Sequence, residues 1–208
     1  MTYHIGDSMT SQAVDRRSAF YETSATPTYF VDGKREGQGG GLRSAAVEIY
    51  EQRIVPIIDR ALPEAPVASL ALAATIKGAI VSVNGTVVTE SQAAHAVLQI
   101  LLVEEEVRYS GSNGIRFHPM VARAVAPSTG RGLALETGIP TAVNETFDLV
   151  RLGDELRAHV AGTAFGPHLL ASEWRDHIDS ARVAIIAFVQ EERRRRVLQS
   201  VVMKPATR

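Results

Sequence analysis

The sequence has no cysteine among its 208 residues, and this absence excludes several kinds of chemistry. Thiolates are the nucleophiles of thiol–disulfide exchange and the sulfur ligands of metal sites, so this chain carries out neither role with its own residues. A disulfide framework is excluded for the same reason. The lack of cysteine leaves the redox compartment of the protein undetermined.

An excess of one charge and long hydrophobic runs are also missing. Lys and Arg number 22 against 23 Asp and Glu, so no global field attracts nucleic acid or an anionic membrane. The apolar runs 67–76 and 183–189 are far shorter than the ~20 residues needed to cross a bilayer. Residues 1–7 lack the basic start and apolar stretch of a secretory signal. We therefore expect no nucleic-acid partner and no membrane-spanning segment.

Two prolines divide the chain. Its length and its 45% hydrophobic content allow one large core or two small ones. Pro63 and Pro66 stop a helix and stiffen a linker, and the hydrophobic pattern changes after them. The sequence therefore predicts two domains, residues 1–62 and residues 67–208.

The first of these segments mixes helices with a hairpin. Residues 12–21 predict a short helix, and the β-branched and aromatic run 28–31 predicts a strand that ends in an Asp32-Gly33 turn. A stripe of apolar residues predicts a longer helix over 42–62, which Pro56 should kink or split. The glycines of 37–41 lack the Lys-Ser/Thr of a phosphate-binding loop and predict a flexible turn, so we expect no cofactor there.

The second segment is rich in predicted strands. One helix is predicted over 152–160, and a polar loop over 162–179 that carries Trp174. Alternating patterns with short turns are typical of a β-sandwich, and the fold class expected for the whole chain is α+β. The strands are predicted at residues 70–76, 80–88, 94–109, 115–126, 142–149, 183–190 and 197–203.

Several blocks of the sequence resemble a known group of bacterial proteins. Thr-Pro-Thr-Tyr-Phe-Val at 26–31 is similar to the cis-proline strand of thioredoxin folds, and the blocks 102–109, 113–121 and 183–190 follow in the expected order. In this group a thioredoxin-like domain precedes a β-rich domain, and members are usually exported. The resemblance implies that Pro27 follows a cis peptide bond and that Thr26 and Pro27 form a peptide-facing edge.

The same resemblance shows what is missing. Members of the group carry a first strand and a Cys-x-x-Cys, whereas here that strand survives at most as residues 2–5. Our main hypothesis is a non-catalytic binding or structural module that self-associates or binds a protein partner. Such contacts would cover Tyr3, Ile5, Tyr29 and Val31, which otherwise expose an apolar face and an open sheet edge. The alternative is the C-terminal fragment of an exported thiol–disulfide oxidoreductase whose Cys-x-x-Cys lies upstream.

Three further residues are weak candidates for acid/base or metal chemistry. Glu104 and Glu106 share one face of a predicted strand, and paired carboxylates perform acid/base work or bind a divalent cation. With His118 they would form the site of a metal-assisted hydrolase. The competing interpretation is charges paired with arginines across the sheet and a hydrogen-bonded, half-buried histidine. Because the histidines lack ligand spacing, we expect no metal.

Overall fold

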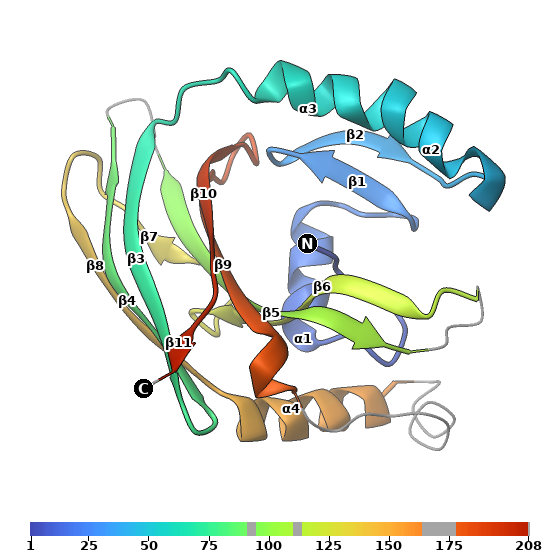
Figure 1. Cartoon of the computed structure of the whole chain (residues 1–208). Coiled ribbons are helices and arrows are strands. Elements are labelled where there is room, and N and C mark those ends of the chain that lie inside the picture. Colours follow the sequence, from blue (N-terminus) through green and yellow to red (C-terminus); the bar gives the residue numbers. More distant parts are fainter. Residues whose placement is uncertain (91–94, 110–113, 164–177, 208) are drawn as a thin grey trace.

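Two sheets stacked face to face form the largest part of the fold (Figure 1). The computed structural model describes residues 1–90, 95–109, 114–163 and 178–207. Within these residues, strands pair antiparallel in both sheets except β11 with β3. One sheet has the order β10 (Val197–Met203), β9 (Val183–Glu191), β5 (Ala96–Arg108) and β6 (Phe117–Ala126), with β7 (Leu133–Ala134) also paired to β5. The other has the order β11 (Ala206–Thr207), β3 (Ala68–Lys77), β4 (Ile80–Thr89) and β8 (Thr141–Asp148).

The main core lies between these sheets. Alternate residues of β4 and β5 point into it, such as Val81 and Val83 from one sheet and Leu98 and Ile100 from the other. Helix α4 (Leu149–Ala161) closes one end of the core with Leu152 and its other apolar residues. The helix begins where the Asp148 carboxylate accepts hydrogen bonds from two backbone N–H groups of its first turn.

The five-stranded sheet is buried on both faces, which explains the unbroken apolar runs of its central strands. Its outer face carries a second cluster that includes Leu101, Val103 and Phe188. Helix α1 (Gln12–Phe20) covers this cluster with Val14, which has no exposed surface. Ser11 starts the helix, and its hydroxyl accepts a hydrogen bond from the N–H of Val14 at 3.2 Å.

Residues 22–67, which we call the N-terminal arm, extend from this body (Figure 1). Strands β1 (Thr28–Val31) and β2 (Lys34–Gln38) form a hairpin, and one long helical stretch lies over it. This stretch consists of η1 (Arg43–Ala45), α2 (Ala46–Ile49), a π-helical turn η2 (Tyr50–Ile54) and α3 (Val55–Ala61). The π-helical turn comes just before Pro56, which has no N–H to donate, so the predicted interruption is present.

The structure confirms the predicted α+β class, and each strand predicted in the second segment is present within a few residues of its expected bounds. Residues 2–5 differ from the prediction, because Thr2 forms an isolated parallel bridge with Val121 of β6 and not a strand of the arm. The short strands β7 and β11 were not predicted. Most of the predicted loop over 162–179, including Trp174, lies outside the described residues. The division into domains 1–62 and 67–208 stays a prediction.

Candidate functional site

A buried polar cluster joins helix α1 to the five-stranded sheet. Arg17 is only 2% exposed, and its Nη2 donates to the side-chain oxygen of Gln190 at 2.7 Å and to the hydroxyl of Tyr21 at 3.0 Å. The guanidinium also lies 4.6 Å from the ring centre of Phe20. Burying a charge is costly unless it is hydrogen-bonded, so this cluster fixes the position of α1 on the sheet.

Tyr3 lies beside the same cluster and packs against the outer face of the sheet. Burial raises the pKa of its phenol to about 12, and the nearby Arg17 opposes this shift only in part. Tyr3 is therefore already covered by this chain, whereas Ile5 is 39% exposed.

The turn of the arm's hairpin docks against the turn between β9 and β10. The N–H of Val197 donates to the carbonyl of Asp32 at 2.9 Å. Gly33 has φ +81°, and a Cβ on it would lie 1.7 Å from the carbonyl oxygen of Arg195. Only glycine allows this approach, so the Asp-Gly turn that predicted a hairpin also positions the arm.

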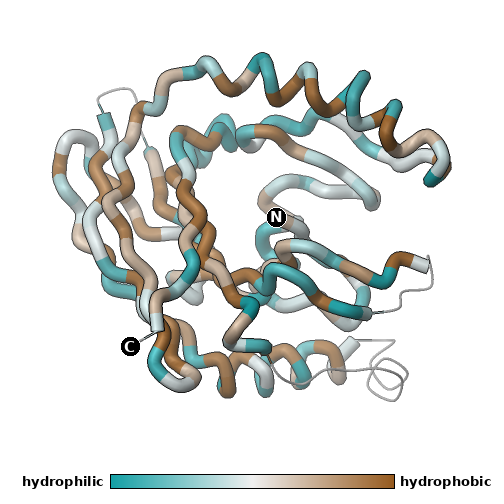
Figure 2. The backbone as a smooth tube through the Cα atoms, viewed as in Figure 1, coloured by the Kyte–Doolittle hydropathy of each residue, from teal (hydrophilic) through white to brown (hydrophobic). Residues whose placement is uncertain are grey.

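Beyond this contact the arm is poorly buried. No residue from 22 to 67 is classed as buried, although the arm contains a hairpin and a long helix. Ile49 and Ile54 on one side of the helix are half-buried. Large apolar side chains remain exposed on the helix and at its ends, namely Leu42, Val47, Tyr50 and Leu62, each more than half exposed. Figure 2 shows hydrophobic and hydrophilic residues mixed along this helix.

Thr26 and Pro27 lie at the start of the hairpin, and both are exposed. The peptide bond between them is cis. The carbonyl of Pro27 accepts a hydrogen bond from the N–H of Gly39 at 2.8 Å, which closes the open end of the hairpin. Their use as a peptide-facing edge stays a prediction.

Glu104 and Glu106 lie in different environments although they share a strand. The Glu104 carboxylate is buried and accepts a hydrogen bond from Nε of Arg123 at 2.6 Å, in an ion pair whose side chains are 7% and 4% exposed. Glu106 lies at the surface between Arg108 and Arg182, whose hydrogen bonds lower the pKa of its carboxyl. Each carboxylate thus has its own arginine partners, as the competing interpretation expects.

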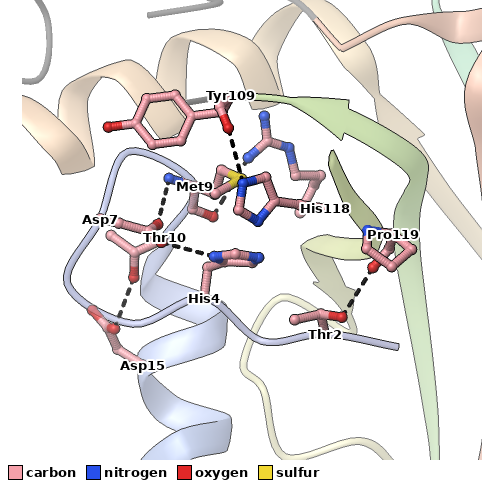
Figure 3. Close-up of polar contacts among 10 residues, drawn as sticks. Thr2, His4, Asp7, Met9, Thr10, Asp15, Tyr109, His118 and Pro119 are labelled. Carbon is pink, nitrogen blue, oxygen red and sulfur yellow. Dashed lines mark hydrogen bonds and ion pairs between the residues drawn. The ribbon is translucent and has the colours of Figure 1, made fainter. Parts of the chain in front are cut away.

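His118 lies in β6 opposite Val107. Its Nε2 is 3.0 Å from the carbonyl oxygen of Tyr109, and its ring centre is 4.9 Å from that of His4 (Figure 3). Among the described residues, no three His, Asp or Glu side chains lie where they could hold a metal ion together. The structure therefore brings His118 to His4 and does not assemble it with Glu104 and Glu106 into a three-ligand centre.

Sequence reasoning missed the partners of these residues. Arg17 and Gln190 are 173 positions apart, and Glu104 and Arg123 are joined across a register shift in the β5–β6 ladder. His4 precedes the first helix and carries no motif. A sequence signal existed only for Arg17, a charged residue on the apolar side of a short helix.

No protein-family model and no curated protein matches the sequence. A solved structure of a bacterial protein does share its fold. HBP35 of Porphyromonas gingivalis superposes with a TM-score of 0.63 and 14% identity, over 98% of this chain and 62% of that one. This chain thus spans less than two thirds of HBP35, and the likeness shows the fold alone.

Two other structures give weaker superpositions. A domain of the outer membrane lipoprotein Omp28 from Porphyromonas gingivalis has a TM-score of 0.42 and 13% identity, over 70% of this chain and 93% of that domain. The GH3 beta-glucosidase of Bifidobacterium adolescentis has a TM-score of 0.32 and 12% identity, over 68% of this chain and 17% of that enzyme. No argument rests on either one. In the described part of the chain, no helix has the length and apolar character needed to cross a membrane.

Proposed function

We propose that this chain is a non-catalytic binding or structural module derived from a thioredoxin-like protein, and that it acts through its N-terminal arm. One observation carries the proposal: residues 22–67 form a hairpin and a helix without burying any residue. Helices and hairpins of this size are marginal unless an apolar face is packed against another surface. The arm therefore has the properties of an element that is completed by a partner.

Helix α1 and the arm that follows it support a thioredoxin-like origin. Helix α1, the hairpin of β1 and β2 and the long helical stretch follow one another in the order of the second half of that fold. The overall likeness to HBP35 is compatible with this origin. Without cysteine, the scaffold keeps its shape and lacks the nucleophile of disulfide exchange, so we assign it binding and not catalysis.

The partner that we propose is a second copy of the chain. The exposed apolar side chains of the arm are Leu42, Val47, Tyr50 and Leu62. An isologous dimer places the same patch of both copies in contact, and the formal net charge of −1 gives little repulsion between copies. Exposed residues Ile5 of the body and Val47 of the arm are natural members of such an interface.

Light scattering coupled to size-exclusion chromatography tests this proposal. We expect the wild-type chain to elute as a dimer and the double variant Val47→Glu/Tyr50→Glu to elute as a monomer, because these residues lie three apart on one helix face. Gln52→Glu is the control: it adds a negative charge at an exposed position on the same helix, about 140–160° around the axis from Val47 and Tyr50. A wild-type monomer at high concentration, or a control as disruptive as the double variant, would refute self-association.

A second candidate is supported by the length of HBP35. This chain covers only 62% of that structure, so a related protein has room for a further segment that completes the arm. In that case the chain is the C-terminal part of an exported thiol–disulfide oxidoreductase whose Cys-x-x-Cys lies upstream. Reading the coding DNA ahead of Met1 tests this: an in-frame Cys-x-x-Cys and signal peptide would favour this candidate over the first.

A further inference from the structure

We propose that His4 and His118 form a two-imidazole binding site for a divalent transition-metal ion such as Zn²⁺. The site lies where the N-terminal segment crosses β6, on the body of the molecule (Figure 3). It uses neither Glu104 nor Glu106, and it does not depend on the proposed function of the arm.

The hydrogen bonds of each ring leave one nitrogen free to act as a ligand. Nδ1 of His4 is 2.7 Å from the Asp7 carboxylate, which only accepts hydrogen bonds, so the ring proton lies on Nδ1 and the lone pair on Nε2. Nε2 of His118 is 3.0 Å from the carbonyl oxygen of Tyr109, so this ring is protonated at Nε2 and has its lone pair on Nδ1. Histidine ligands of metals are typically oriented in this way, by a carboxylate or a backbone carbonyl on the other nitrogen.

The two rings lie against each other in a largely buried place. The His4 side chain is 13% exposed, and its Nε2 is buried without a hydrogen-bond partner among the residues that the structure describes. His118 is 7% exposed, and Figure 3 shows the nitrogen that Tyr109 leaves free on the side of the ring nearer His4. A buried nitrogen lone pair without a donor is costly, and a metal ion between the two rings would satisfy Nε2 of His4.

The ring geometry fits a shared ion. The ring centres are 4.9 Å apart and the ring planes are 74° from each other. With Zn–N bonds of ~2.0–2.1 Å, two imidazoles on one ion have ring centres roughly 5 Å apart. Because three-ligand groups of His, Asp and Glu are absent from the described residues, the remaining coordination positions would belong to water or to a group from outside this chain.

The loop that carries His4 is held firmly in place. The Asp7 carboxylate, besides binding His4, accepts a hydrogen bond from the N–H of Met9 at 2.8 Å. The hydroxyl of Thr10 donates to Asp15 of α1 at 3.1 Å. Thr2 bonds to both Met120 and Ala122 of β6 through its backbone. These contacts fix the His4 ring relative to β6, which reduces the cost of bringing two ligands together.

Isothermal titration of the full, untagged chain with Zn²⁺ at pH 7.5 tests the proposal. We expect one saturable site, which His118→Gln and His4→Gln abolish. Asp7→Asn should weaken binding by ~10–100-fold, because it removes the group that orients His4. His159→Gln is the matched control: it removes another His–Asp pair, with 3.1 Å between His159 and Asp15, and should leave the site intact.

Nitrogen-15 NMR of the imidazoles decides the case even if a variant fails to fold. In the metal-free wild type, Nε2 of His4 and Nδ1 of His118 should give unprotonated signals, and Zn²⁺ should shift these two signals first. Three results would overturn the proposal: no saturable binding of Zn²⁺, a loss of Zn²⁺ binding in His159→Gln as large as in the His4 and His118 variants, or nitrogen-15 signals of His4 and His118 that Zn²⁺ does not shift. So would an imidazolium at pH 7.5, because a proton shared by the rings would then occupy the space.

Discussion

The ion pair between Glu104 and Arg123 gives the sharpest test of how the two candidate carboxylates differ. The Glu104 carboxylate accepts hydrogen bonds from Nε–H of Arg123 at 2.6 Å and from the backbone N–H of Asp179 at 3.3 Å. The side chains of Glu104 and Arg123 are both at least nine-tenths buried. Removing one member of such a pair leaves an uncompensated buried charge. We expect Glu104→Ala to lower the free energy of unfolding by about 3–5 kcal/mol.

Replacing both charges should cost much less than removing one. In Glu104→Met/Arg123→Met the desolvation of both ions is removed, and apolar replacements of buried pairs are often neutral or stabilising. The N–H of Asp179 loses its acceptor, which costs ~1–3 kcal/mol. Glu104→Ala loses the same acceptor, so subtracting ~1–3 kcal/mol from its total cost of ~3–5 kcal/mol leaves the double variant more stable than Glu104→Ala by roughly 0–4 kcal/mol.

Glu106 provides the contrast. It has two arginine partners but lies at the surface, where solvent screens ion pairs, so Glu106→Ala should lower the free energy of unfolding far less than Glu104→Ala does. Urea unfolding of the four proteins, followed by circular dichroism, measures these differences. A cost below ~1 kcal/mol for Glu104→Ala, or a double variant less stable than the single one, would refute a structural role for the buried pair and reopen a chemical role for Glu104.

Three further predictions follow from single residues. Burial raises the pKa of the Tyr3 phenol from 10.0 to about 12. The stability that the protonated phenol contributes is therefore present below pH 10 and is lost as the pH rises from 10 to 12. Unfolding titrations should show that Tyr3→Phe loses less stability in alkali than the wild type does. Hydrogen bonds from two arginines lower the pKa of the Glu106 carboxyl from 4.5. The stability that the ionised carboxylate contributes is therefore present above pH 4.5 and is lost in more acidic solution. As the pH falls below 4.5, Glu106→Gln should lose less stability than the wild type does. Gly33→Ala should increase hydrogen exchange in β1 and β2 and cost more than Gly78→Ala, since both have positive φ but only Gly33 meets a backbone carbonyl.

Much of the fold could be predicted from local patterns. The strand predicted at 197–203 coincides with β10, and the Asp32-Gly33 turn lies where a hairpin was expected. These features depend on alternation, β-branched residues and turn chemistry, all of which act over a few residues. The long apolar run of β5 was recognised as a strand, and its burial on both faces follows from the cover that α1 provides.

The candidate sites were less predictable. Glu104 and His118 were singled out by residue type, but the sequence does not show that Arg123 neutralises the first or that His4 lies beside the second. The β5–β6 ladder shifts register between Leu102 and Val103, so simple alternation does not give the facing partner of Glu104. The strand expected at residues 2–5 is reduced to an isolated bridge between Thr2 and Val121 of β6.

By itself, the sequence determined the fold class, the boundaries of most strands and the absence of thiol chemistry, since each depends on composition or on short-range periodicity. Only the tertiary structure decided which charges are buried as pairs, which histidines meet and which helix remains uncovered. These outcomes depend on contacts between residues far apart in the chain, such as His4 with His118 and Arg17 with Gln190. Such contacts arise when whole elements pack together, and no local pattern encodes them.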